Sequence, residues 1–588
     1  MWPQFQQPGA SGAEVEGAPS VGRAGAPDSG HSAMCGCGAC ALRGGEGETG
    51  PVYAYLNLGD RGGTASNGKT SFTLDQAVNR LTGGEGGWGV LGQPFVATYA
   101  FRSAAPASMP DETSGFTRFN AAQIRQTELA LQAWSDVARI SFVREGSGET
   151  GEAAYSDEAM MLFASYTGGP DGAAGFAYYP GSTSFASRSG DVWIDATASY
   201  NIQPLASNYG GMVLVHEIGH AIGLGHPSDY PDTGSASYGA DASYFEDSRQ
   251  YTVMSYFGGF NTGASLPGFS AVPLLDDIAA VQFMYGANMT TRTGDTVYGF
   301  NSNAGRPWFE AVSSASIMQW AVWDAGGRDT FNFSGYSSNQ VIDLRPGFFS
   351  DVGGYRGNVA IARGADIEDA IGGAGADLIT GNSLANRLTA GGGSDSVFGG
   401  DGADTILEAS GANYLRGDAG NDSVSGGTGF DDINGNMGND TLRGNDGEDW
   451  VVGGRDDDLV FGDAAFDIVY GNMGNDTVDG GAGNDWVRGG QGEDSVQAGS
   501  GHDWVWGDRG SDTLSGGAGA DLFHSFSGAG IDRIVDFNVA EGDRLKLEGS
   551  PSRTIAQVGA DVIVDMGNGD QVILVGVTLA SLGSGWIL

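Results

Sequence analysis

A nine-residue pattern repeats from about Gly372 to His524 without a break in register, and it constrains the fold more than any other feature of the sequence. Across these 17 units the sixth position is Asp in 15 and Asn in two, the eighth is apolar in all, and the fourth is Gly in 14. A flexible glycine-rich linker would not keep an aliphatic residue in register over this length. The pattern therefore predicts a regular solenoid rather than a linker.

The alternation of a glycine-rich half and a short apolar half is typical of the calcium-binding nonapeptide repeat, which folds as a parallel β-helix. Glycine permits tight turns that bring carbonyl oxygens beside the aspartate carboxylates, and Ca²⁺ accepts about six to eight such oxygens. We expect two units to complete one coil, the 15 carboxylates to line one column, and the roll to fold only when calcium binds. The calcium ligands predicted within the repeats are Gly373, Gly375, Asp377, Asp395, Asp404, Asp422, Asp431, Asp440, Asp449, Asp458, Asp467, Asp476, Asp485, Asp494, Asp503, Asp512 and Asp521.

Composition excludes several classes of partner. The chain of 588 residues has 28 Lys and Arg against 72 Asp and Glu, a net charge of −44, which argues against binding nucleic acid or an anionic membrane surface. Because 40% of the residues are hydrophobic and 12 are Trp, the chain is not a typical disordered acidic protein. No apolar run approaches the ~18 residues of a membrane span. The N-terminus lacks the basic and apolar regions of a Sec-type signal peptide.

The first 50 residues are rich in Gly, Ala, Ser and Pro without apolar periodicity, and we expect a flexible leader that is removed as a propeptide. The only three cysteines of the chain, Cys35, Cys37 and Cys40, lie within it, so the fold is not built on disulfides. These cysteines could bind a metal, form a disulfide, supply a thiolate to the metal site as a latency switch, or belong to an incidental tail.

Residues 51–290 have the composition of a globular domain, which we predict to be mixed α/β. Asn120 and Gln123 resemble a capping box before an apolar helical face, and Pro273 precedes a second helix. The runs SFV (141–143), MLFASY, GFAYYP and DVWID predict strands. Beyond this α/β domain we expect the start of a C-terminal β domain at 291–371, the all-β roll at 372–524 and a cap at 525–588.

The run HEIGHAIGLGH, residues 216–226, contains three of the six histidines of the chain. His216 and His220 are four residues apart, so on a helix both imidazoles leave one face, as two ligands of a tetrahedral Zn²⁺ must. Gly223 allows the helix to end in a left-handed residue, so that His226 can complete the site. The alternative, surface histidines without a metal, does not account for the extended HExxHxxGxxH pattern, which is typical of the metzincin proteases.

Met254 and Tyr256 form a second element, 28 residues or more beyond the third histidine. An isolated methionine is most often a core residue. Metzincins, however, place a methionine-containing turn beneath the zinc histidines, so the pair Met-x-Tyr at this spacing supports the metal site.

On these motifs the chain resembles the serralysins, secreted bacterial zinc metalloproteases in which a metzincin domain precedes a calcium-binding roll. Further similar stretches lie between about residues 67 and 380, and they include NGKTSFTLDQAVNRLT, QAWSDVARISF, SRQYTVMSYF, LLDDIAAVQFMYGAN and WDAGGRDTFNFSGY. The resemblance implies that His216, His220 and His226 bind one Zn²⁺ and that Glu217 is the catalytic base. It also implies that Tyr256 is an additional zinc ligand that can swing away.

The resemblance implies structural calcium sites before the repeats as well. Their ligands would be Arg292, Gly294, Thr296, Asp324, Gly326, Asp329, Asp366 and Glu368. Asp366 stands where the family more often has Thr. The number of nonapeptides exceeds what we expect of the family, and the cysteine-containing leader is not a feature of it.

We expect a metalloendopeptidase of broad specificity, in which zinc activates a water, Glu217 accepts its proton, and Tyr256 helps to stabilise the oxyanion. An extended substrate would add to an edge strand, for which residues 175–180 are the best candidate. The alternative is a calcium-binding surface or matrix protein with an inert protease-like domain.

We also expect an extracellular monomer, exported by a type I secretion machinery that reads the uncleaved C-terminus. The partners would then be protein and peptide substrates together with that machinery. The C-terminal sequence VGVTLASLGSGWIL would carry the export signal.

Overall fold

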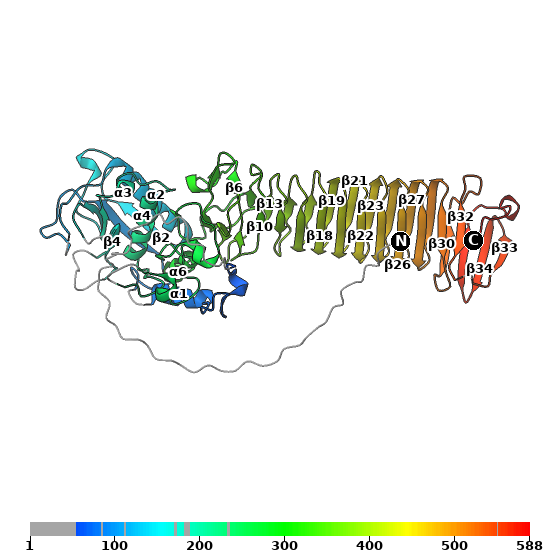
Figure 1. Cartoon of the computed structure of the whole chain (residues 1–588), viewed down its shortest axis with the longest axis horizontal. Coiled ribbons are helices and arrows are strands. Elements are labelled where there is room, and N and C mark those ends of the chain that lie inside the picture. The colour runs from blue at the N-terminus through cyan, green and yellow to red at the C-terminus, as the bar shows by residue number, and fades with distance from the viewer. Residues whose placement is uncertain are drawn as a thin grey trace, which may run out of the picture.

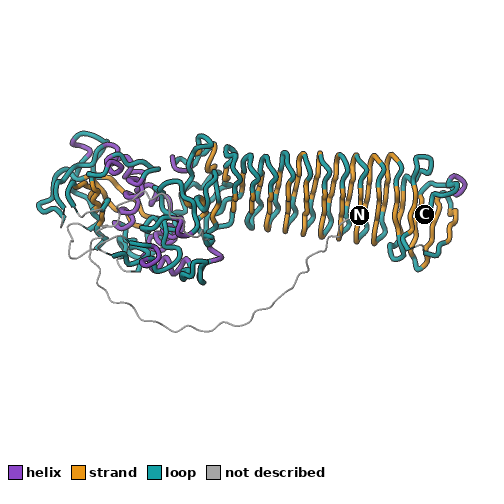
Figure 2. Tube along the Cα trace, in the orientation of Figure 1, coloured by secondary structure: helices purple, strands orange, loops and turns teal. Residues whose placement is uncertain are grey.

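The protein is described here by a computed structural model, which covers residues 54–83, 86–110, 113–169, 173–181, 189–231, 236–549 and 551–588. The predicted leader and its cysteines lie outside the described residues. Figure 1 shows an elongated molecule with a mixed α/β domain at one end, a long β-roll, and a β-cap at the other end. The helices gather in the first domain, and strands run along the rest of the length (Figure 2). The predicted fold class is confirmed.

The first domain contains a five-stranded sheet in the order β2-β1-β3-β5-β4. Four strands are parallel, and β4 is antiparallel to β5 and lies at the edge. All four predicted strand runs are present, although only the first three residues of GFAYYP are a strand. The bounds are β1 (Phe95–Phe101), β2 (Ile140–Arg144), β3 (Met161–Tyr166), β4 (Gly175–Ala177) and β5 (Val192–Asp195).

Helices cover this sheet and carry the metal-binding motif. The expected capping box begins α2, where the Asn120 side chain accepts hydrogen bonds from Ala122 and Gln123. Every residue of α4 is buried, and the indole N–H of Trp134 in α2 donates to the carbonyl of Val215 in α4 (3.1 Å). The bounds are α1 (Leu74–Thr82), α2 (Ala121–Val137), α3 (Ser199–Ile202), α4 (Tyr209–Ala221), α5 (Tyr238–Asp241) and α6 (Leu275–Tyr285).

Parallel ladders begin before the nonapeptides. Strands β6, β9 and β13 lead into the longer of the two roll sheets, β10 begins the other, and β11-β12-β8 form a separate small sheet. The bounds are β6 (Val297–Phe300), β7 (Glu310–Ala311), β8 (Trp320–Val322), β9 (Thr330–Asn332), β10 (Val341–Asp343), β11 (Phe349–Ser350), β12 (Val359–Ile361) and β13 (Asp369–Ile371).

In the roll, successive strands alternate between an 11-stranded sheet and a 16-stranded sheet, so two units complete one coil as predicted. The apolar residue at the eighth position of each unit lies in the core. The strands of the 11-stranded sheet are β14 (Leu378–Thr380), β16 (Ser396–Asp401), β18 (Asn413–Ala419), β20 (Asp431–Met437), β22 (Trp450–Arg455), β24 (Ile468–Met473), β26 (Trp486–Gln491), β28 (Trp504–Arg509) and β30 (Leu522–Ser525). Those of the 16-stranded sheet are β15 (Arg387–Thr389), β17 (Thr405–Leu407), β19 (Ser423–Thr428), β21 (Thr441–Asp446), β23 (Leu459–Ala464), β25 (Thr477–Ala482), β27 (Ser495–Gly501) and β29 (Thr513–Gly519).

The expectation of one column of carboxylates is wrong, because the coil has two turns and each turn carries its own column. The backbone N–H of Asp377 donates to the carboxylate of Asp395, 18 residues later, and that of Asp404 donates to Asp422 in the same way. Asp377 and Asp395 directly precede β14 and β16 of the 11-stranded sheet. Asp404 and Asp422 directly precede β17 and β19 of the 16-stranded sheet. Carboxylates of neighbouring units therefore lie on opposite edges of the roll.

The predicted C-terminal strands close the roll. Strand β32 ends the 11-stranded sheet, and an antiparallel set of β33, β34 and β35 ends the other beside β31. The bounds are β31 (Ile531–Ile534), β32 (Arg544–Leu547), β33 (Thr554–Val558), β34 (Asp561–Gly567) and β35 (Asp570–Leu574). No helix in the described part of the chain is long and apolar enough to cross a membrane.

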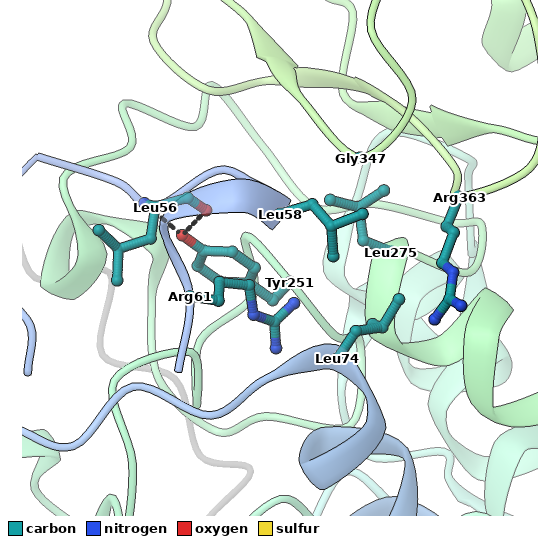
Figure 3. Close-up of a pocket in the computed structure, with 8 residues that line it drawn as sticks. All are labelled: Leu56, Leu58, Arg61, Leu74, Tyr251, Leu275, Gly347 and Arg363. Atoms are coloured by element: carbon teal, nitrogen blue, oxygen red, sulfur yellow. Dashed lines mark hydrogen bonds between the residues drawn. The ribbon is translucent and has the colours of Figure 1, made fainter. Parts of the chain in front are cut away.

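A short N-terminal segment joins the first domain to the β region. The Tyr251 hydroxyl accepts a hydrogen bond from the N–H of Leu56 (2.8 Å), and the N–H of Leu58 donates to the carbonyl of Gly347 (3.0 Å). Figure 3 shows these residues around a small pocket, which Arg61, Leu74, Leu275 and Arg363 also line. This pocket contains none of the predicted zinc ligands.

Candidate metal centre and active site

The three predicted zinc histidines point their Nε2 atoms at one another. The Nε2 atom of His220 lies 3.1 Å from those of His216 and His226, and the latter two are 3.4 Å apart. Ligands placed tetrahedrally about 2.05 Å from a zinc ion would lie about 3.3 Å apart. The spacing and the donor chemistry therefore fit a zinc ion bound to all three side chains.

Backbone carbonyls orient two of these rings. The Nδ1 atom of His216 lies 2.8 Å from the carbonyl of Val253, and that of His220 lies 2.7 Å from the carbonyl of Leu224. Since a carbonyl can only accept, Nδ1 carries the proton and Nε2 keeps its lone pair for a metal. Burial lowers the pKa of His216 to about 4 and lowers the pKa of both other histidines well below the ordinary 6.5, so all three are neutral at neutral pH.

Two glycines permit this arrangement. Gly219 lies between the first two histidines, and a β-carbon there would be 2.7 Å from the sulfur of Met254, which is fully buried. Met254 thus lies beneath the histidine helix, as the sequence predicts. Gly223 has φ +109° after the end of α4, a conformation that redirects the chain toward His226.

Tyr256 lies beside the metal site. Its ring centroid is 4.8 Å from that of His226 in a T-shaped arrangement, and its ring stacks on Tyr230 at 4.1 Å. The buried carboxylate of Asp247 accepts hydrogen bonds from the hydroxyls of Tyr230 and Ser255, both at 2.6 Å. This carboxylate therefore fixes the ring on which Tyr256 rests and the residue that precedes Tyr256 in the chain. Sequence reasoning missed Asp247 and Tyr230.

A second missed carboxylate, Asp277 at the start of α6, holds the strand-like segment beneath the histidines. It accepts hydrogen bonds from the Thr252 hydroxyl (2.6 Å) and from the N–H of Val253 (2.8 Å). The carbonyl of the same Val253 orients His216. Asp277 is completely buried, which raises its pKa to about 7. Its position in the stretch LLDDIAAVQ was visible in the sequence, but its partners lie about 25 residues away.

The predicted general base lies between the metal site and the edge strand. Glu217 is fully buried, and a β-carbon on Gly175 of β4 would lie 3.2 Å from its Cγ. A side chain at this position would press on Glu217 and on the carbonyl of Trp193, which lies 3.1 Å from the same β-carbon. Glu217 also lines a narrow gap beside the metal site. The other residues around this gap are Tyr209, Met212, Val213, His216, Arg249, Ser255 and Tyr256.

The predicted calcium ligands before the repeats come together in two adjoining loops and a third segment. The carboxylate of Asp329 accepts from the N–H of Thr296 (2.7 Å), and the N–H of Asp329 donates to Glu368 (2.7 Å). Burial, with Asp324 and Glu368 nearby, raises the pKa of Asp329 to about 7. The hydroxyl of Thr296 donates to the carbonyl of Gly294 (2.8 Å). The side chain of Arg292 pairs with Asp136 (3.1 Å), and its Nε lies 4.0 Å from the carboxylate of Asp324.

The two carboxylate oxygens of the aspartates at the sixth position of each unit differ in their hydrogen bonds. In each, Oδ1 accepts a backbone N–H, while Oδ2 of 14 of them accepts no hydrogen bond from the described residues and is buried. Burial raises the pKa of Asp458 and of Asp467 to about 8. An array of buried anionic oxygens without donors is the chemistry that a row of cations would complete.

Comparison with known proteins gives two family matches. Residues 111–243 match the family described as matrixin, and residues 287–558 match the peptidase M10 serralysin C-terminal family. Serralysin G of Dickeya chrysanthemi is 45% identical over 347 residues, which cover 57% of this chain and 70% of that protein. Metallopeptidase AprA of Pseudomonas marginalis is 44% identical over 351 residues, 57% of this chain and 71% of that protein. The extracellular lipase LipA of Serratia marcescens is 18% identical over 36% of this chain and 39% of its own, with a TM-score of 0.18, too low to support any argument.

Proposed function

This chain belongs to the serralysins and is a metalloendopeptidase, and from this premise we propose that Glu217 is the general base of a zinc-dependent hydrolysis of peptide bonds. The observation that carries the proposal is the convergence of three histidine Nε2 atoms within 3.4 Å of one another beside a buried glutamate. Membership of the family argues against the alternative of an inert, calcium-binding surface protein.

We infer that His216, His220 and His226 hold the zinc ion. A zinc ion bound by three histidines lowers the pKa of a water in its open position to about 7. The carbonyls of Val253 and Leu224 keep two of the ligand rings in the required tautomer, and burial keeps all three neutral. These features support binding of the metal, because no proton has to leave the ligand nitrogens first.

Glu217 follows the first ligand in the same helical turn. In this proposal its carboxylate takes a proton from the attacking water and later gives that proton to the leaving amine. The Tyr256 hydroxyl, held above the site by the Tyr230 ring, donates a hydrogen bond to the oxyanion.

The substrate would bind as an extended strand along β4, because β4 is an edge strand and Gly175 lies against Glu217. Main-chain pairing of this kind recognises the peptide backbone rather than particular side chains, so it favours broad specificity.

Calcium would bind in two places: the cluster around Asp324, Asp329 and Glu368, and the turns of the roll. The open Oδ2 atoms of the position-six aspartates support the second set of sites. We further propose that the chain is exported by a type I system, loses residues 1–50 and acts as an extracellular monomer. In this proposal the domains divide after residues 290, 371 and 524. The low positive charge of the chain, 28 Lys and Arg against 72 Asp and Glu, agrees with a partner other than nucleic acid.

The test is casein hydrolysis combined with zinc analysis. Glu217→Ala should retain about one zinc per chain and lose activity by at least about 10³-fold, since the proton carrier is gone. Glu152→Ala, which changes an exposed glutamate paired with Arg118, is the matched control and should keep full activity. Activity that persists in Glu217→Ala would contradict the assigned base, and a purified wild-type chain that cannot bind zinc would contradict the metal site.

A further inference from the structure

The two sheets of the roll have different outer faces. On the 16-stranded sheet, the outward positions that flank the core residue are mostly Thr and Ser. On the 11-stranded sheet, seven of the same positions carry aromatic rings, which we call the aromatic face. Its exposed rings are Tyr414, Trp450, Trp486 and Trp504, and its half-buried rings are Phe398, Tyr470 and Trp506.

The seventh position of each unit gives one row of this face. Trp486 and Trp504 are directly paired on neighbouring strands, and their rings are nearly parallel, with centroids 5.2 Å apart. Trp450 lies two strands earlier in the same row. These three indoles are 45%, 36% and 40% exposed in chain order, which is unusual for so large an apolar side chain.

The ninth position gives a second, parallel row. Tyr470, Arg488 and Trp506 are successive partners in register, and the Arg488 guanidinium lies 5.5 Å from the first ring and 5.6 Å from the second. Trp506 then stacks on His524 at 4.2 Å. The row is therefore a continuous stack of flat groups, which holds each ring in a fixed orientation.

The solenoid does not require these aromatic rings. Val487 and Val505 already fill the core beneath them, and both are fully buried. The opposite sheet forms the same parallel ladders with Thr477, Ser495 and Thr513 at the corresponding outward position. Phe461 is the one aromatic ring at these positions of the nonapeptides in the 16-stranded sheet, so a structural role does not explain why the rings are concentrated on the other sheet.

The charges on the aromatic face are paired within it. Arg488 makes two hydrogen bonds of 2.8 Å to Asp508, and Arg416 pairs with Asp432 at 2.9 Å. The face is therefore close to neutral, although the chain as a whole carries −44. That net charge disfavours a second copy of the chain, nucleic acid or an anionic membrane as the occupant.

From these observations we propose that the aromatic face binds a neutral, extended polysaccharide. Sugar rings present apolar C–H faces to aromatic side chains, and their hydroxyls hydrogen-bond to paired Arg and Asp groups. Parallel strands lie about 4.8 Å apart, close to the length of one sugar unit in an extended chain. A polysaccharide lying along the roll would therefore meet Trp486 and Trp504 on neighbouring coils, and Trp450 two coils earlier in the same row. The roll would hold the protease at glycan-covered material.

The experiment measures retention of the full-length protein on chitin and cellulose particles in calcium-containing buffer, using the Glu217→Ala chain to prevent self-digestion. The protein with the unchanged aromatic face should be retained on the particles. The double variant Trp486→Ala/Trp504→Ala should bind to them at least about tenfold more weakly. The double variant Trp486→Tyr/Trp504→Tyr, which keeps the rings, should retain most of the binding. This second variant keeps the test valid if the alanine variant folds poorly.

Leu459→Ala is the matched control, because Leu459 is 44% exposed at the seventh position of the opposite sheet. It should leave retention unchanged, and every variant should be retained poorly on anionic alginate. Failure of the wild-type face to bind either particle would overturn the proposal. So would equal retention of the alanine variant, binding to alginate or anionic vesicles alone, or dimerisation through this face in light scattering.

Discussion

Asp458→Asn should stabilise the calcium-free roll and weaken the calcium-bound one, and this opposite pair of effects tests the calcium assignment directly. Asp458 is 1% exposed, its Oδ1 accepts the N–H of Asp440 (2.9 Å), and its own N–H donates to Asp476 (2.9 Å). Asparagine fits such a position, because Asn413 already occupies one. Its Oδ1 accepts the N–H of Asp395 (3.0 Å) just as an aspartate would.

The magnitude follows from the pKa of the carboxyl. Burial, together with the neighbouring carboxylates Asp440 and Asp476, raises the pKa of Asp458 from 3.8 to about 8. At about 1.4 kcal/mol per pH unit this corresponds to roughly 5 kcal/mol of destabilisation at pH 8, of which we expect about 1–2 after screening by solvent and salt. Since the folded state binds the proton more tightly, the loss of stability begins near pH 4 and grows until about pH 8.

The same argument applied to the whole roll predicts that calcium-free protein loses its β-roll at neutral pH. Even about 1 kcal/mol for each position-six aspartate whose pKa is raised sums to the entire stability of an ordinary domain. A single aliphatic residue in each unit cannot offset that cost. Millimolar Ca²⁺ should restore the roll cooperatively, and equal Mg²⁺ should not, because Mg²⁺ demands tight octahedral geometry.

The assay is far-ultraviolet circular dichroism of the Glu217→Ala chain. In EGTA, Asp458→Asn should move the pH at which half the β signal is lost to a higher value. In a calcium titration at pH 7.5, the same variant should need several-fold more Ca²⁺ to fold. Asp446→Asn, at an exposed position of the same roll, is the control and should change neither. A variant that weakens both forms, or a roll that stays folded in EGTA at pH 7.5, would refute the reasoning.

Three further predictions concern the active site and export. Tyr256→Phe should lower kcat about 10²-fold with little change in KM, measured on a fluorogenic peptide, and an effect on KM alone would count against its role at the oxyanion. Asp277→Asn should weaken zinc binding about tenfold in a chelator competition, since Val253 loses the partner that positions its carbonyl for His216, and unchanged zinc affinity would remove that role. Deleting the last ~50 residues, which include β33–β35, should leave the protein inside the producing cells, and undiminished secretion of the truncated chain would exclude a C-terminal signal.

Local patterns in the sequence predicted the parts of the site that depend on local geometry. His216 and His220 share a helix face because of their spacing, and Gly223 ends that helix. The supports of the site escaped prediction because they join distant segments. Asp277 reaches Val253 across 24 residues, and nothing in the sequence around either one indicates the other. The two columns of carboxylates were missed although a coil of two units was predicted. Aspartates of alternate units lie on different turns of that coil, and the hydrogen bonds connect residues 18 apart.

This difference between the period of the sequence and the period of the coil limits how such a protein can change its length. Removing 18 residues would take away one full coil, shorten the roll by about 4.8 Å and leave every later strand in its sheet. Removing nine would transfer every later strand to the opposite sheet, so Trp486 and Trp504 would join the row of Thr and Ser. The cap would also meet the wrong strand, because β31 and β32 each continue a particular sheet. Evolution can therefore lengthen or shorten this roll by pairs of units, and an odd change would require a new cap.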